Sequence, residues 1–190
     1  SSERRFTMLA ESAWSGALSA RLNAEGCALS EDKPTDLIYA VEPVQADAAG
    51  ESLTPFIDSM RTLLPQAHAA QQRLWIITSG AYSDTRSPHA HQPFSAGVLG
   101  FMRVAANEFK GLDIRVIDTH PDLDSETKAH RVAREILAPR PDREVHLAPE
   151  DTQVPRIRTR LPAATSDGQD NRTPQGQKLG FGTSAGLDEL

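Results

Sequence analysis

The sequence predicts an α/β fold in which a mainly parallel sheet is flanked by helices. Short apolar runs alternate with longer segments whose apolar residues recur every three or four positions, as in buried strands and amphipathic helices. The clearest pair is an apolar run at 74–78, closed by Ser79-Gly80, and a helical pattern at 94–109. A strand, a loop and a helix in this order form half of a βαβ unit, which indicates this fold class.

Strands and helices of the same kind are predicted before this stretch. They are a strand over 5–11, a helix over 12–25, a short strand over 27–29, a strand over 36–41, a loop over 47–50 and a helix over 52–71. We expect Ser52 to be the N-cap of the last helix, because its hydroxyl can accept a hydrogen bond from the first turn. Pro65 falls late in this helix and should kink or end it.

Further elements are predicted after residue 109. They are a strand over 112–118, a turn over 119–122, a helix over 125–137 capped by Ser125, and strands over 144–148 and 154–161. The last strand alternates Arg156, Arg158 and Arg160 with mainly apolar residues, so one of its faces should lie in water. This alternation favours a solvated edge strand over a phosphate-binding patch.

Composition limits the classes of function. A net charge of −6 and a pI near 5.5 argue against a nucleic-acid or anionic-membrane surface. No apolar run approaches the roughly 20 residues of a spanning helix, and the N-terminus is no signal peptide, so we expect a cytoplasmic domain. The single cysteine, Cys27, excludes an internal disulfide and should be a small core residue. The histidines are scattered and are expected to be unrelated surface or half-buried rings, with no metal site.

The turn between the first predicted strand and helix lacks the features of a dinucleotide site. Such a turn is rich in glycine, because the backbone must approach the pyrophosphate closely and leave the helix N-terminus uncovered. Here the turn contains Glu11, Ser12, Ala13, Trp14 and Gly16. It has a single glycine, a bulky tryptophan that would crowd the nucleotide, and an acidic side chain that would repel phosphate. We therefore expect no cofactor-binding residues in this chain.

The stretch around Ser79 is similar to the catalytic part of short-chain dehydrogenases. In that family a Ser at the strand end binds the carbonyl oxygen, a Tyr about a dozen residues later donates a proton, and a Lys four positions further lowers the pKa of the Tyr. Ser79 could take the first role, but Phe94 and Val98 stand where the Tyr and Lys are expected. The resemblance thus implies a helix without its catalytic groups and no catalytic residues in this chain.

Four segments together resemble the structural half of a modular polyketide synthase ketoreductase, also called the pseudo-ketoreductase. They are LIYAVEP at 37–43, RLWIITSGAYS at 73–83, FSAGVLGFMRVAANEF at 94–109 and IRVIDTHPDLD at 114–124. The resemblance implies a truncated Rossmann-like domain that binds no cofactor and braces a second half. That catalytic half would bind NADPH and reduce a β-keto group carried on the phosphopantetheine of an acyl carrier protein.

The domain organisation follows from a change in composition after Leu161. We expect a pseudo-ketoreductase subdomain over 1–161 and a linker over 162–178, which contains no large apolar residue. The segment LGFGTSAGLDEL at 179–190 resembles the first strand of an enoylreductase. We expect a piece of a longer multienzyme, with the catalytic ketoreductase half and the enoylreductase as partners.

Two other functions stay open. An active NAD(P)-dependent reductase would have to use Ser79 with Tyr82, only three residues later, and a displaced lysine. A docking module for the acyl carrier protein or an adjacent domain would depend on exposed charge at Arg131, Arg134 and Arg143.

Overall fold

The computed structural model describes residues 4–10, 12–30, 32–41, 49–82 and 92–155. Contacts divide the chain into two units, Ser1–Arg156 and Ile157–Leu190, and every described residue belongs to the first. The expected linker, the enoylreductase-like segment and Glu11 lie outside the described residues.

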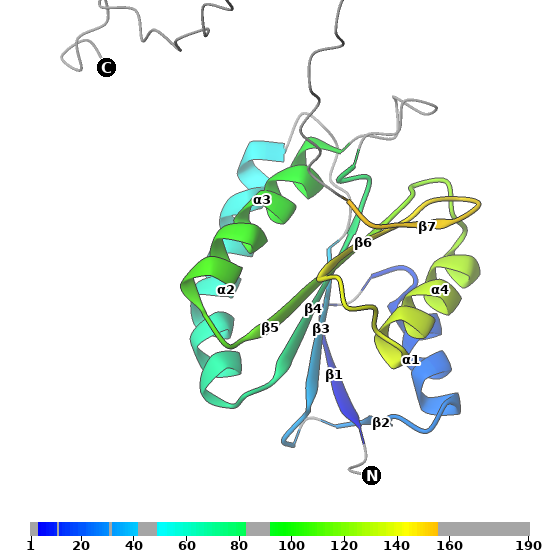
Figure 1. The fold of residues 1–190 in the computed structure, drawn as a ribbon, viewed down its shortest axis with the longest axis horizontal. Helices are drawn as coiled ribbons and strands as arrows, with labels where there is room; N and C mark the ends of the chain where they lie inside the picture. Colours follow the sequence, from blue (N-terminus) through cyan, green and yellow to red (C-terminus); the bar gives the residue numbers. More distant parts are fainter. Residues whose placement is uncertain (1–3, 11, 31, 42–48, 83–91, 156–190) are drawn as a thin grey trace, which may run out of the picture. The chain divides into compact units, whose positions relative to one another are not determined.

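A seven-stranded sheet forms the centre of the first unit (Figure 1). Its strands are β1 (Arg5–Ala10), β2 (Ala28–Leu29), β3 (Asp36–Ala40), β4 (Arg73–Ser79), β5 (Asp113–Thr119), β6 (Glu144–Leu147) and β7 (Thr152–Gln153). The strand order is β2-β1-β3-β4-β5-β6-β7, and only β7 runs antiparallel to its neighbour. The predicted class, a mainly parallel sheet flanked by helices, is confirmed.

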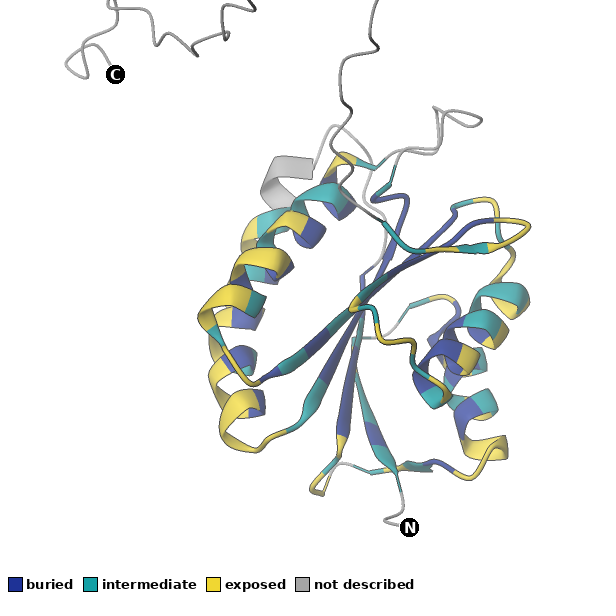
Figure 2. Ribbon diagram, viewed as in Figure 1, coloured by how far each residue is buried: buried dark blue, intermediate teal, exposed yellow. Residues whose placement is uncertain are grey.

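Helices cover both faces of this sheet. They are α1 (Ser15–Ala24), α2 (Ala49–Ala69), α3 (Pro93–Glu108) and α4 (Ser125–Leu137). Helices α2 and α3 lie on one face and α1 and α4 on the other, and each turns its buried side toward the sheet (Figure 2). Along β4, Leu74 and Ile76 pack in the core under α2 and α3, whereas Trp75 and Ile77 pack under α1 and α4. This alternation follows from the two-residue repeat of a strand that is buried on both faces.

Helix α2 begins and ends earlier than predicted, at 49–69 instead of 52–71. It begins at Ala49, so Ser52 lies inside the helix and is not its N-cap. Pro65 does not end it either, because the helix continues to Ala69. Met60 and Ala67 on its inner face are fully buried, and this packing outweighs the hydrogen bond that the proline cannot donate. The helix ends where Gln71 adopts a positive φ of 53°.

Two details in the C-terminal part of the described chain also differ from the prediction. The N-cap of α4 is Asp124, whose Oδ1 accepts a hydrogen bond from the backbone N–H of Thr127 at 2.9 Å, and not Ser125. The last described strand, β7, lies before the predicted strand at 154–161. Val154 and Pro155 lie outside any strand, since a proline has no N–H for the ladder, and residues 156–161 are not described.

The remaining predictions at this level concern Cys27 and membrane spans. Cys27 precedes β2 and is buried, as expected of a small core residue, and burial raises the pKa of its thiol. None of the helices in the described ranges has the length and apolar character that a membrane span requires.

Candidate functional site

The turn after β1 leads to the place where an open α/β sheet binds its ligands. Because β2 and β3 lie on opposite sides of β1, the strand order reverses there, and a crevice forms at the carboxyl ends of such strands. Trp14 directly precedes α1, and its side chain packs in the core with Leu18 and Leu22. The Trp14 side chain is 9% exposed, so most of its bulk lies in the core.

The backbone of this turn is closed by its own serines. Ser15 Oγ accepts a hydrogen bond from the Ser12 N–H at 3.0 Å and donates one to the Ser12 carbonyl oxygen at 2.9 Å. Gly16 is exposed, and a Cβ added there would meet no atom within 4 Å. No close backbone approach within the described chain thus requires this glycine.

A row of polar side chains crosses the carboxyl ends of three central strands. Thr78 of β4, Asp118 of β5 and His146 of β6 are register partners and lie side by side. The Asp118 carboxylate is fully buried, and it accepts hydrogen bonds from Thr78 Oγ1 at 2.8 Å and from the N–H groups of Ala81 and Tyr82 at 2.9 and 3.2 Å. His146 Nδ1 lies 2.9 Å from the Oδ2 atom of Asp118. Asp118 therefore fixes the chain that follows β4.

Tyr82 is held by charged neighbours from α3 and β6. Its hydroxyl donates a hydrogen bond to Glu144 Oε2 at 2.7 Å, and Arg103 Nη2 contacts the same oxygen at 2.7 Å. Burial and the Glu144 carboxylate raise the pKa of Tyr82, while the hydrogen bond from Arg103 lowers the pKa of Glu144. A proton donor tuned for catalysis needs the opposite shift, which is produced by a neighbouring cation that stabilises the phenolate.

Phe94 and Val98, which stand where the resemblance to short-chain dehydrogenases leads one to expect the Tyr and Lys, lie in the apolar core. Phe94 is 5% exposed and Val98 is 0% exposed, and both pack against the sheet beneath α3. Ser79 is also buried, and within the described chain its hydroxyl oxygen has no hydrogen-bond partner. The structure therefore brings Ser79 to the end of β4, as predicted, and places Phe94 and Val98 as packing residues.

Two histidines were predicted wrongly. His120 and His146 were expected to be unrelated surface or half-buried rings, but they are 2% and 4% exposed, with ring centroids 6.4 Å apart. They meet because each lies at the carboxyl end of one of two adjacent parallel strands, β5 and β6, or directly after it. The sequence did contain a signal for this burial, because His120 closely follows the predicted strand at 112–118 and His146 lies within the one at 144–148. Among the described residues, no group of three or more His, Cys, Asp or Glu side chains could hold a metal ion, and His89 and His91 lie outside them.

The arginines considered for docking do not share one surface. Arg131 is partly buried, and its guanidinium donates hydrogen bonds to the carbonyl oxygens of Ala148 and Asp151 in the turn between β6 and β7. It therefore has a structural role that the sequence did not indicate. Arg134 lines the same pocket as Arg131, whereas Arg143 lines another pocket beside α3.

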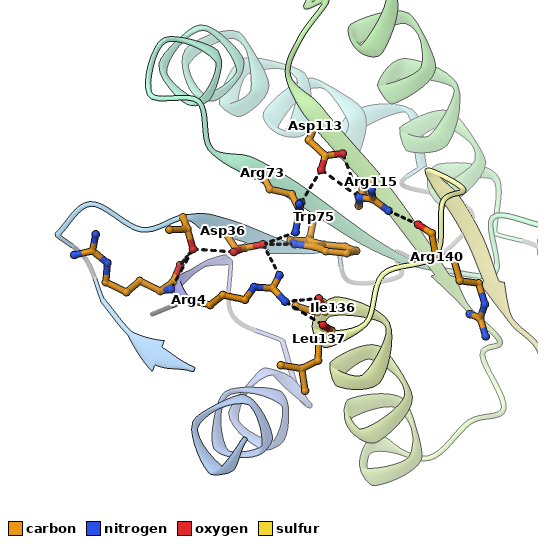
Figure 3. A network of polar contacts seen from close by, with 11 residues as sticks. Arg4, Asp36, Arg73, Trp75, Asp113, Arg115, Ile136, Leu137 and Arg140 are labelled. Atoms are coloured by element: carbon orange, nitrogen blue, oxygen red, sulfur yellow. Dashed lines mark hydrogen bonds and ion pairs between the residues drawn. The ribbon is translucent and has the colours of Figure 1, made fainter. Parts of the chain in front are cut away.

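A second polar network lies at the opposite, amino-terminal ends of the strands (Figure 3). Asp36, Arg73 and Asp113 are register partners on three adjacent strands, and Arg73 Nε donates to Asp113 Oδ2 at 2.6 Å. Trp75 Nε1 donates to Asp36 Oδ1 at 2.9 Å, and Arg4 Nη2 lies 3.0 Å from the same oxygen. Burial alone would raise the pKa of Asp36, but the hydrogen bonds from Trp75 and Arg4 lower it. Sequence reasoning missed this network, although a charged residue opens each of the three strands.

A mainly parallel sheet with helices on both faces and this reversal of strand order defines a Rossmann-like domain. The model of one protein family matches residues 3–157, and it describes the Rossmann fold domain of the polyketide synthase extender module SpnB. The chain belongs to this family. A search of curated proteins returned no match.

Solved structures of ketoreductases share the fold. A C2-type ketoreductase from a modular polyketide synthase is 20% identical with a TM-score of 0.58, over 84% of this chain and 42% of that chain. The ketoreductase from the first module of phoslactomycin biosynthesis in Streptomyces sp. HK803 is 18% identical with a TM-score of 0.50, over 80% of this chain and 33% of that one. The present chain thus spans less than half of these two ketoreductases. It has a ketoreductase-like Rossmann fold within a polyketide synthase family.

Proposed function

We propose that this chain is the non-catalytic structural half of a ketoreductase in a reducing type I polyketide synthase. In this role it braces the catalytic half, which binds NADPH, and spaces the neighbouring domains. The observation that carries the proposal is the burial of Phe94 and Val98 at the positions of the catalytic Tyr and Lys. A catalytic pair must reach substrate and cofactor, whereas these two side chains fill the core beneath α3.

The surroundings of Tyr82 support the same proposal. The rival assignment, an active reductase that uses Ser79 and Tyr82, requires a tyrosine that can release its proton. Burial and Glu144 raise the pKa of Tyr82, and the nearby cation, Arg103, is paired with Glu144. The fully buried Asp118 fixes the loop that carries Tyr82, so little rearrangement toward a substrate is available.

The proposal extends to the organisation of the parent protein. It assigns residues 1–161 to the structural subdomain, 162–178 to a linker and 179–190 to the start of an enoylreductase. NADPH and phosphopantetheine would serve other parts of the parent multienzyme, which we place in the cytoplasm, and the acyl carrier protein would be a further partner.

Cofactor binding tests the proposal. NADPH is titrated into the chain, and binding is followed by calorimetry and by the fluorescence of the reduced nicotinamide. We expect no saturable binding and no oxidation of NADPH with a β-keto thioester. Micromolar binding, or reduction of the ketone by this chain alone, would refute the proposal.

A further inference from the structure

A small pocket is lined by residues from the C-terminal part of α4 and from the segment that includes β6 and β7. Its volume is about 190 Å³, and its lining includes Arg131, Arg134, Glu135, Arg140, Leu147 and Thr152. Pockets for drug-sized ligands or cofactors start at roughly 300 Å³. The size therefore suits one compact chemical group and excludes a whole nucleotide.

The wall of this pocket is held rigidly. Arg131 donates hydrogen bonds to the carbonyl oxygens of Ala148 and Asp151, and its Nη2 lies 3.3 Å from Thr152 Oγ1. Arg140 donates through its backbone N–H to Glu135 Oε1 at 3.0 Å, and its guanidinium pairs with the other oxygen of this buried carboxylate. Groups fixed in this way lose little conformational entropy when a ligand binds.

The pocket carries excess positive charge in a chain whose net charge is −6. Three arginines face one glutamate among its lining residues, and that glutamate is already paired with Arg140. Within the described chain the Arg134 side chain makes no hydrogen bond or ion pair, and it is exposed. Burial and the charges of Arg134 and Arg140 lower the pKa of Arg131, which Asp151 only partly offsets.

The end of α4 explains only part of this charge. A helix C-terminus carries about half a negative charge and favours one cation in its last turn, which accounts for Arg134 alone. Three arginines less one glutamate leave a net +2 among the lining residues, so the pocket stays positive beside the helix end. A phosphate group carries about −1.5 to −2 charges at neutral pH and offers several acceptor oxygens, which matches donors on more than one side.

We propose that this pocket binds a phosphate group, either as free phosphate or as the phosphate of a larger ligand that reaches in from outside. Arg134 supplies the unpaired guanidinium, Arg140 supplies the donors that Glu135 leaves open, and Thr152 offers its hydroxyl proton. A carboxylate fits less well, because its two coplanar oxygens are satisfied by a single guanidinium fork. This inference does not rest on the proposed structural role, so either can fail without the other.

The test is a titration of the full chain with inorganic phosphate at low ionic strength. Binding is followed by calorimetry and by the NMR signals of the arginine Nε–H groups. We expect saturable binding that shifts the Arg134 and Arg140 signals. Arg134→Ala should weaken the affinity about tenfold, as expected for the loss of a charged hydrogen bond.

Arg61→Ala is the matched control. Arg61 lies on α2, is 75% exposed and pairs with Asp58, and its removal changes the net charge equally. We expect the phosphate affinity of this variant to equal that of the parent. The proposal is overturned if both variants weaken binding equally, if binding does not saturate, or if succinate saturates at a lower concentration than phosphate. Arg134→Ala removes no hydrogen bond or ion pair within the described part of the chain, so circular dichroism should show that the variant keeps the fold.

Discussion

Asp118 shows how one residue organises the end of the central strands. It is a buried carboxylate that accepts a hydrogen bond from a threonine on the neighbouring strand and two from the backbone that follows β4. A carboxylate without water is stable only when donors of this kind surround it. In a ligand-binding site some of these hydrogen-bond donors would point toward the ligand. Here the threonine hydroxyl and the two backbone N–H groups all donate to the Asp118 carboxylate.

Replacing this carboxylate tests its structural weight. Asp118→Asn keeps the size of the side chain but places an amide where an acceptor is needed, opposite His146 or the backbone N–H groups. We expect the free energy of unfolding in urea to fall by about 2–4 kcal/mol. Asp58→Asn on the exposed face of α2 is the control and should change it by less than about 0.5 kcal/mol. Equal effects of the two variants would contradict this assignment.

Gln71 adopts a left-handed backbone conformation that is unfavourable for a residue with a side chain. It closes α2 with φ of 53°, while its N–H donates to the His68 carbonyl oxygen at 3.2 Å. Only glycine adopts this region without steric cost, so Gln71→Gly should raise the free energy of unfolding by about 0.5–1 kcal/mol. The same change at Gln66, inside α2, should lower it by a similar amount. Thermal unfolding of both variants checks the opposite signs, and two destabilised variants would refute the explanation.

At the scale of elements, α3 is an amphipathic helix whose inner face serves packing. Its inner face carries Phe94, Val98, Met102 and Ala105 against the sheet. The periodicity of these residues made the helix predictable, because one-sided burial leaves a clear repeat in the sequence. The resemblance to short-chain dehydrogenases also implied that Phe94 and Val98 stand where the Tyr and Lys are expected. That the replacing side chains would be almost fully buried required the structure.

Introducing the Tyr and Lys of the short-chain dehydrogenase pattern should therefore destabilise this helix. Val98→Lys would bury an ammonium group at a site with 0% exposure, and we expect a loss of about 3 kcal/mol or more in unfolding free energy. Val104→Lys on the same helix, at 59% exposure, is the control and should cost less than about 0.5 kcal/mol. If Val98→Lys with Phe94→Tyr is as stable as the parent, the core assignment of these positions is wrong.

The contact of α3 with β6 should make stability depend on pH. Arg103 lowers the pKa of Glu144 in the folded state, so this carboxylate stabilises the fold above its unfolded pKa of about 4.3. That contribution is lost as the pH falls through the lowered pKa. Between pH 6 and pH 3, Glu144→Gln should therefore lose less stability than the parent, as measured by urea unfolding. An unchanged pH slope would show that the pair contributes nothing.

At the scale of the molecule, the sequence predicted the parallel sheet and its helices, because both depend on local periodicity. It did not predict the contacts made across strands, such as those of Asp118 with His146 or Asp36 with Trp75. These partners lie 28 and 39 residues apart, and only the register of the strands brings them together. The caps at Ser52 and Ser125 were wrong for a local reason, since a better cap or an earlier helix start was available.

In the proposed function, this domain contributes shape and no chemistry to a ketoreductase. The most direct measurement compares ketone reduction by the separately produced catalytic half, with NADPH, in the absence and in the presence of this chain. We expect this chain alone to be inactive, and its addition to raise both the activity and the melting temperature of the catalytic half. Reduction by this chain alone, or a catalytic half that is equally stable and active without it, would contradict the claim.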